Sequence, residues 1–295
     1  MKNILNYYYK MIVDENKIDD NGYFSYDNHL FCLYEYKRSL SEIDALDYLN
    51  NLMLSKGIKV NRIIRNIFNQ VITYHDNRNL CLIMINYQYS NKSNIKFIKS
   101  FNNIEFNVLK RNNWGKLWSM KIDYIEYQLA HINNSYPLLN DSINYYIGLA
   151  ENAISYFNRL DLNNISLYIS HRRISIDNIY NPLEFVIDYK VRDIGEYIKY
   201  NFFNKSMTIN EIKSYISALS LENIDYILLY IRLLYPSYYF DLYDEIINEK
   251  KEETEINKVI ELNSSYEELL YEIYSIFKRK INILGIDWIN KKYAK

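Results

Sequence analysis

A change in the hydrophobic pattern near residue 88 constrains the fold of this chain more than any other feature. Before it, short aromatic and β-branched runs are separated by polar turns, as is typical of strands. After it, apolar residues recur at helical spacing over long stretches. The 295 residues, 49% of them apolar, are enough for two lobes with a sizeable core. The sequence therefore predicts an α+β chain with a small β-rich lobe at 1–88 and a larger, mostly helical lobe at 89–295.

The first lobe carries the signals of a hairpin and one main helix. Two aromatic runs at 22–26 and 30–36 flank Asp27-Asn28, a dipeptide that favours a tight turn. An apolar stripe then begins after an expected capping box of Ser41 with Asp44 and ends at Gly57. The expected order is strand, strand, helix and three more strands, the last three at 63–68, 71–74 and 80–85.

The second lobe begins with a polar segment at 90–93, which is expected to be a linker. Residues 114–129 show the spacing of a long amphipathic helix. Two short β-like runs follow a second helical stripe, at 165–169 and 185–187. The remaining residues predict helices, among them a buried helix at 224–234 and two capping boxes, Thr208 with Glu211 and Ser265 with Glu268.

Composition and charge exclude several classes of function. A net charge of -1, from 35 Lys and Arg against 36 Asp and Glu, argues against a nucleic-acid binder. Two cysteines are too few for a disulfide framework, and six glycines form no glycine-rich phosphate loop. No signal peptide or membrane-spanning run is visible, so a cytoplasmic protein without a membrane partner is expected. The 33 tyrosines are typical of the coding bias of an AT-rich genome.

The predicted order of elements matches the plan of a two-lobed, protein-kinase-like fold. In that plan, the loop after the first central strand of the helical lobe carries a base and a metal-binding Asn, and the next strand ends in a metal-binding Asp. His171 to Asn178 fall at the loop, and the apolar run at 185–187 ends in Asp188. Asp188 and Asn178 are therefore the candidate metal ligands.

The candidate site departs from an active small-molecule kinase at several positions. Arg172 and Arg173 occupy the loop positions where an active kinase carries Gly and the catalytic Asp. Arginine cannot accept a proton, although its guanidinium can hold phosphate. Tyr34 falls at the position of the nucleotide-orienting lysine, and Lys37 is the nearest substitute. No catalytic residue is assigned: His171 is expected to orient the loop or cap a strand end, and the candidate nucleotide-binding residues are Arg172, Arg173, Asn178 and Lys37.

A few motifs in a fixed order carry a resemblance to a known family. They are Trp114–Trp118 with Lys121–Glu126, Tyr145–Ala153, Ser170–Arg173, and Val186–Asp188 with Arg192–Ile198. With these motifs the chain resembles endospore coat proteins of the CotS/YutH type, a branch of the aminoglycoside and choline phosphotransferase-like kinases. The resemblance implies a role in endospore formation, in the mother-cell cytoplasm or the spore coat, with coat proteins as partners.

Three hypotheses follow. The preferred one is a catalytically inactive kinase-like protein that acts as a binding or assembly module. The second is an active phosphotransferase that uses ATP and Mg²⁺, with Asp177 or Asp188 in place of the missing carboxylate. The third is a purely structural coat protein without a nucleotide site. The sequence indicates neither an acceptor substrate nor an oligomeric state.

Overall fold

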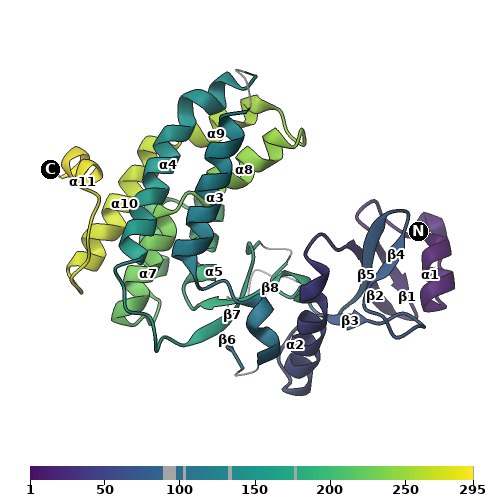
Figure 1. Cartoon of the computed structure of the whole chain (residues 1–295). Helices are drawn as coiled ribbons and strands as arrows, with labels where there is room; N and C mark the ends of the chain where they lie inside the picture. The colour runs from purple at the N-terminus through teal and green to yellow at the C-terminus, as the bar shows by residue number, and fades with distance from the viewer. Residues whose placement is uncertain (89–97, 102–103, 132–134, 176–177, 295) are drawn as a thin grey trace. The chain divides into compact units, whose positions relative to one another are not determined.

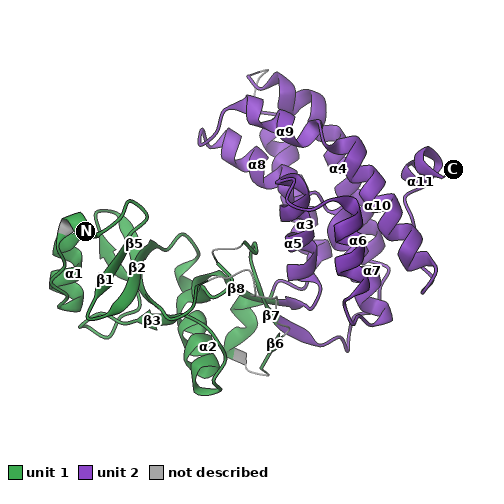
Figure 2. Ribbon diagram, turned by 180° about the vertical axis from the view of Figure 1, so that it is seen from behind, with its two compact units in different colours: residues 1–110, 169–187 green, residues 111–168, 188–295 purple. Residues whose placement is uncertain are grey.

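The computed structural model describes residues 1–88, 98–101, 104–131, 135–175 and 178–294 (Figure 1). The chain divides into two compact units (Figure 2). Unit 1 contains Met1–Lys110 and Ile169–Ile187, and unit 2 contains Arg111–Tyr168 and Asp188–Lys295. This grouping by compactness differs from the single boundary expected after residue 88, and that boundary between domains stays a prediction. The linker expected at 90–93 lies outside the described residues.

Unit 1 is built on a five-stranded sheet of order β1-β2-β5-β3, in which β4 also pairs with β5. The predicted hairpin is confirmed, because Asp27 and Asn28 turn the chain with positive φ angles of 48° and 59°. Cys32 and Cys81 are buried on the neighbouring strands β2 and β5, where Cys81 faces Tyr34. The strands are β1 (Tyr23–Tyr26), β2 (His29–Glu35), β3 (Arg62–Ile64), β4 (Thr73–His75) and β5 (Arg78–Ile85).

Two helices pack against this sheet. α1 (Lys2–Tyr9) was not anticipated from the sequence, and its Ile4 and Leu5 pack against Phe31 and Leu33 of β2. α2 (Ile43–Ser55) is the expected main helix, and its Asn50 side chain hydrogen-bonds to the backbone of the segment that forms β3. The capping box expected at Ser41 is wrong: a short 3-10 turn (Leu40–Glu42) precedes α2, and Ser39 caps that turn instead.

A three-stranded sheet of order β6-β7-β8 carries the candidate site. Its strands are β6 (Ile98–Lys99), β7 (Leu167–His171) and β8 (Phe185–Tyr189), and β7 and β8 confirm the two short β-like runs of the sequence. Every residue of β8 is buried. A short 3-10 turn, Pro182–Glu184, leads into β8 and is capped by the side chain of Asn181.

Unit 2 is helical. α3 has the bounds that the sequence predicted, and the predicted buried helix at 224–234 and the Thr208–Glu211 capping box are also confirmed. The capping box at Ser265 is wrong, because α10 already begins at Asn263. Among the described residues, none of the helices combines the length and apolar character needed to cross a membrane. The helices are α3 (Trp114–Leu129), α4 (Pro137–Phe157), α5 (Arg192–Phe203), α6 (Ile209–Ser217), α7 (Asn223–Leu234), α8 (Ser237–Ile247), α9 (Asn257–Ile260), α10 (Asn263–Lys278) and α11 (Asp287–Tyr293).

Candidate functional site

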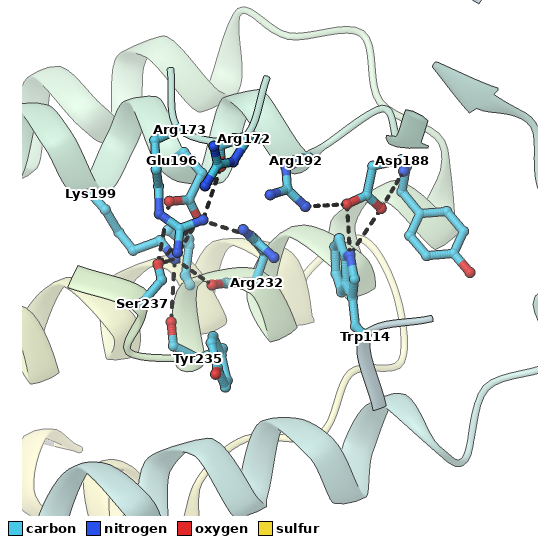
Figure 3. A network of polar contacts seen from close by, with 12 residues as sticks. Trp114, Arg172, Arg173, Asp188, Arg192, Glu196, Lys199, Arg232, Tyr235 and Ser237 are labelled. Atoms are coloured by element: carbon cyan, nitrogen blue, oxygen red, sulfur yellow. Dashed lines mark hydrogen bonds and ion pairs between the residues drawn. The ribbon is translucent and has the colours of Figure 1, made fainter. Parts of the chain in front are cut away.

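Asp188 lies near the end of β8, at the centre of a buried polar cluster in unit 2 (Figure 3). The indole N–H of Trp114 donates to both carboxylate oxygens, at 2.9 and 3.0 Å. Arg192 donates to Oδ2 at 2.5 Å, and the backbone N–H of Tyr189 donates to Oδ1 at 2.8 Å. Each oxygen of Asp188 therefore accepts two hydrogen bonds, and one of the donors is a permanent cation.

The local sequence explains how these partners reach Asp188. α5 begins at Arg192, three residues after β8 ends at Tyr189, so that Arg192 stands four residues from Asp188. Trp114 is the first residue of α3, and the side chain of the preceding Asn113 caps that helix. Because the connection between β8 and α5 is so short, the first side chain of the helix turns back onto the strand end.

The charges around Asp188 are balanced inside the unit. Burial raises the pKa of Asp188 above its ordinary value, while Arg192, Arg232 and the hydrogen bond from Trp114 oppose that rise. The guanidinium carbon of Arg232 lies 5.2 Å from the ring centre of Trp114 and 5.6 Å from that of Trp118. A buried carboxylate is costly unless it is paired and hydrogen-bonded, so these contacts hold Asp188 in place.

A second buried carboxylate, Glu196 of α5, extends the cluster (Figure 3). It accepts a hydrogen bond from Arg232 Nε at 2.9 Å and pairs with Lys199 at 2.8 Å. A Cβ atom at Gly195 would lie 2.7 Å from Cγ of Arg232, so this glycine allows α5 to approach α7 closely. Arg232 thus links Glu196 to the tryptophan that holds Asp188.

The arrangement of Asp188 bears on metal binding. Mg²⁺ requires oxygen ligands in near-octahedral geometry, usually carboxylates and waters. Asp188 as placed does not fit that role, because Arg192 already supplies the positive charge and the other donors occupy both oxygens. Among the described residues, no group of three or more His, Cys, Asp or Glu side chains is arranged to hold a metal ion. Metal binding by Asp188 and Asn178 stays a prediction.

His171 is buried at the end of β7, in unit 1. Its Nε2 lies 3.0 Å from the carbonyl oxygen of Ile179, which can only accept, so this nitrogen carries the proton. Its ring meets the ring of Phe185 edge-on, with 5.2 Å between the centres. Both contacts tie the end of β7 to residues beyond the loop, and the orienting role of His171 stays a prediction.

The loop itself is closed by its own polar groups. Asn178 accepts from the backbone N–H of Ser175 at 2.9 Å and donates to the carbonyl oxygen of Arg173 at 2.6 Å. The side chain of Arg173 donates to the carbonyl oxygen of Arg172 at 2.9 Å, and both arginines are exposed. The roles of Arg172, Arg173 and Asn178 in nucleotide binding stay predictions, and Asp177 lies outside the described residues.

Two neighbouring cations that follow β2, Lys37 and Arg38, differ in burial, and the role of Lys37 in nucleotide binding stays a prediction. The Lys37 side chain is 73% exposed and forms an ion pair with Glu35 at 3.5 Å. The next residue, Arg38, is buried, pairs with Glu42 and donates to the carbonyl oxygens of Leu183 and Phe185 at 2.6 and 2.8 Å. Arg38 therefore connects the end of β2 to the segment that enters β8, all within unit 1.

Tyr34, which the sequence predicts at the position of the nucleotide-orienting lysine, hydrogen-bonds to another phenol. Its hydroxyl lies 3.0 Å from that of Tyr23 on β1. Burial is the largest of the effects that raise the pKa of Tyr34 well above its ordinary value. The phenol is therefore neutral at physiological pH and cannot replace the positive charge of a lysine beside phosphate.

The turn before β1 is closed by a carboxylate. Oδ1 of Asp19 accepts from the backbone N–H groups of Asn21 and Tyr23, at 3.0 and 2.7 Å. The N–H of Gly22 donates to the backbone oxygen of Asp19 at 3.0 Å. Phosphate-binding turns hold their ligand with consecutive backbone N–H groups. Here those groups are bound to an acidic residue of the chain itself.

Several of these residues were missed or undervalued at the sequence level. Trp114 stood out only as the start of an amphipathic helix and of one family motif, whereas it also donates to Asp188. The spacing of four residues between Asp188 and Arg192 was the available signal for their pairing. Nothing in the sequence separates Arg38 from Lys37, and Asp19 carried no recognised motif. Within unit 1 the structure brings His171, Arg172, Arg173 and Asn178 together in one loop.

The sheets, the strand-end aspartate and the helical remainder define a protein with a kinase-like phosphotransferase fold. An aminoglycoside phosphotransferase from Alicyclobacillus acidocaldarius has a TM-score of 0.56 and 8% identity, covering 90% of this chain and 95% of that one. A spectinomycin phosphotransferase in complex with AMP has a TM-score of 0.56 and 11% identity, covering 95% of this chain and 98% of that one. At such identities the likeness shows the fold alone.

The sequence comparisons place the chain within that class. The chain belongs to the family described as "Spore coat putative kinase YutH", whose sequence model matches residues 2–273. The endospore coat-associated protein YutH of Bacillus subtilis (strain 168) is 24% identical over 208 residues. That match covers 60% of this chain and 61% of the relative, so it spans less than two thirds of the relative's length.

Proposed function

We propose that this protein has lost phosphoryl transfer and acts as a binding or assembly component of the endospore coat, with other coat proteins as partners. The observation that carries the proposal is the state of Asp188, whose two oxygens are bound by Trp114, Arg192 and the backbone. Phosphoryl transfer depends on metal ions that neutralise charge on the phosphates. A strand-end aspartate paired with arginine does not supply that function.

Three further features support the proposal. Arg173 stands where the proton acceptor is expected, the neutral phenol of Tyr34 stands where the lysine is expected, and Asp19 binds the N–H groups of the turn before β1. Each of them alone could be compensated. Together they leave no proton acceptor at position 173 and no lysine at position 34, and they occupy the N–H groups of the turn before β1.

The family and its coat-associated relative support a location in the spore coat or in the mother cell during coat formation. Spectinomycin phosphotransferase structures contain AMP or ADP. By analogy, the alternative for this chain is that it binds ATP with Mg²⁺. It would then either transfer the γ-phosphate or only hold the nucleotide.

Calorimetry and a γ-phosphate release assay with ATP, with and without Mg²⁺, test the proposal. We expect no turnover above that of a protein-free blank. Turnover that Asp188→Asn abolishes would contradict it, provided that the exposed Asp141→Asn variant of the same unit keeps full turnover. Circular dichroism shows whether each variant is folded. A rise in melting temperature with nucleotide alone would establish binding and exclude a purely structural protein without a nucleotide site.

A further inference from the structure

α3 carries a second apolar face in addition to the one that packs into unit 2. Trp114, Trp118 and Ile122 line the buried face. On another side of the helix, four large apolar side chains, which we call the α3 stripe, are 40 to 65% exposed: Leu117, Met120, Tyr124 and Tyr127. Single exposed apolar residues are ordinary on a protein surface. Four at a spacing of three, four and three residues form a continuous ridge, which is typical of a helix that pairs with another helix.

Composition alone does not explain the stripe. Tyrosine is abundant in this chain, so Tyr124 and Tyr127 could be exposed by chance. Leu117 and Met120 belong to commonly buried residue types, and they continue the same ridge by a full turn.

The charges beside the stripe indicate what covers it. Lys116 is exposed beside its N-terminal half, and Asp123 and Glu126 are exposed beside its C-terminal half. Lys121, in the middle, is already bound to Asp244 of α8 at 2.6 Å. A parallel copy of this helix would bring like charges together. An antiparallel copy brings Lys116 alongside the carboxylates of the other chain, twice by symmetry.

We propose that the α3 stripe is a self-association surface, on which two copies of this chain pair antiparallel about a two-fold axis. Leu117 of one copy then packs against Tyr127 of the other, and Met120 packs against Tyr124. One helix-to-helix contact is small beside the ~1,600 Å² of a standard interface, so the pairing is weak and depends on concentration. This surface goes beyond the proposed loss of catalysis and does not depend on it.

Sedimentation velocity of the full chain across a concentration series tests the pairing. We expect a monomer–dimer equilibrium with a dissociation constant on the order of micromolar. Met120→Glu should weaken it at least about tenfold, because it places a charge in the centre of the contact. The matched control is Leu284→Glu, which changes an exposed apolar residue of unit 2 between α10 and α11 and should leave the equilibrium unchanged. A monomer at every concentration, or a dimer that Met120→Glu leaves intact, overturns the proposal.

Charge reversal tests the orientation. Lys116→Glu should weaken the dimer, and combining it with Glu126→Lys should restore the affinity. In a parallel pair, Lys116→Glu would only replace one contact between like charges by another, because both copies carry the change, so an affinity that Lys116→Glu leaves unchanged would refute the antiparallel arrangement. Circular dichroism of each variant confirms that the helices remain intact.

Discussion

Polar side chains are used differently in the loop of unit 1 and in the buried cluster of unit 2. In the loop, Asn178 and Arg173 bind backbone atoms within five residues of themselves, and both arginines are exposed. In the cluster, Trp114 reaches Asp188 across 74 positions of the sequence, and Arg232 reaches Glu196 across 36. The loop contacts shape one turn, whereas the cluster contacts join separate helices and a strand.

The difference bears on how freely each of these side chains can be exchanged. An exposed side chain such as that of Arg173 can usually be exchanged at little cost to stability. Asp188 cannot be replaced so freely, because its loss leaves Arg192 buried without its carboxylate. Asp188 therefore has a structural role in unit 2 that is independent of metal binding.

The largest effect is expected where the buried cluster is broken. Arg192→Met should reduce the free energy of unfolding by about 3–5 kcal/mol, because it leaves a buried carboxylate without its cation. Urea denaturation at neutral pH measures the loss. Arg159→Met, a change at an exposed arginine of the same unit, should cost less than about 0.5 kcal/mol.

Urea denaturation of a double variant shows whether the loss of stability in Arg192→Met comes from the unpaired carboxylate. Combining Arg192→Met with Asp188→Asn should recover part of the lost stability, because the carboxylate is removed together with its partner. Strictly additive losses in the two variants would show that the ion pair is not the cause.

Arg38 makes a buried, long-range contact in unit 1. Its substitution therefore tests whether the cost to stability follows the unit or follows the burial of the contact. Arg38→Met should cost about 3 kcal/mol even in unit 1, since Glu42 and two carbonyl oxygens lose a buried donor. Lys37→Met, at the neighbouring exposed cation, should change the free energy of unfolding by less than about 1 kcal/mol. Equal costs for the two variants would contradict the assignment of Arg38 as the buried connection.

A smaller effect is expected from crowding the cluster without changing its charges. Gly195→Ala should destabilise the protein by about 1–3 kcal/mol, because the new methyl group meets the restrained side chain of Arg232. Gly148→Ala is the matched control, since nothing lies within 4 Å of the added methyl group on α4. That helical substitution should be neutral or stabilise by up to about 1 kcal/mol. The melting temperatures of the two variants, each compared with that of the wild type, test this prediction.

The smallest effect is expected at an exposed, local contact of unit 2. Glu211 accepts hydrogen bonds from Thr208 at the start of α6, and these bonds lower the pKa of Glu211. A lowered carboxyl pKa stabilises the native state above the unfolded value of 4.5, and this contribution is lost as the pH falls through the native value. The melting temperature of Glu211→Ala should lie slightly below that of the wild type at pH 7. The gap should close at acidic pH, and a gap that widens there would contradict the assignment.

The sequence predicted those elements whose signals are local. The Asp27-Asn28 turn, the bounds of α3 and the Thr208 cap each depend on a few neighbouring residues. α1 escaped prediction because its short apolar face becomes meaningful only against β2. The caps at Ser41 and Ser265 failed because packing moved the helix starts away from them.

In the candidate site, too, the features with local signals were predicted and those that depend on tertiary packing were not. The positions of His171, Asn178 and Asp188 followed from spacing along the chain. Their partners did not, because Trp114 and Arg38 reach their acceptors only after distant segments have folded together. Arg38 and Lys37 are neighbours of like charge, and only the tertiary structure makes one of them buried.

The two cysteines both lie in the sheet of unit 1, and they give the molecule a built-in reporter. Burial raises the pKa of the Cys32 thiol to about 12 and also raises that of Cys81, so neither is the reactive thiolate while the sheet is closed. A thiol reagent would modify them only when β2 or β5 separates from its neighbours. The rate of labelling would thus measure the opening of the sheet of unit 1 alone, because unit 2 contains no cysteine.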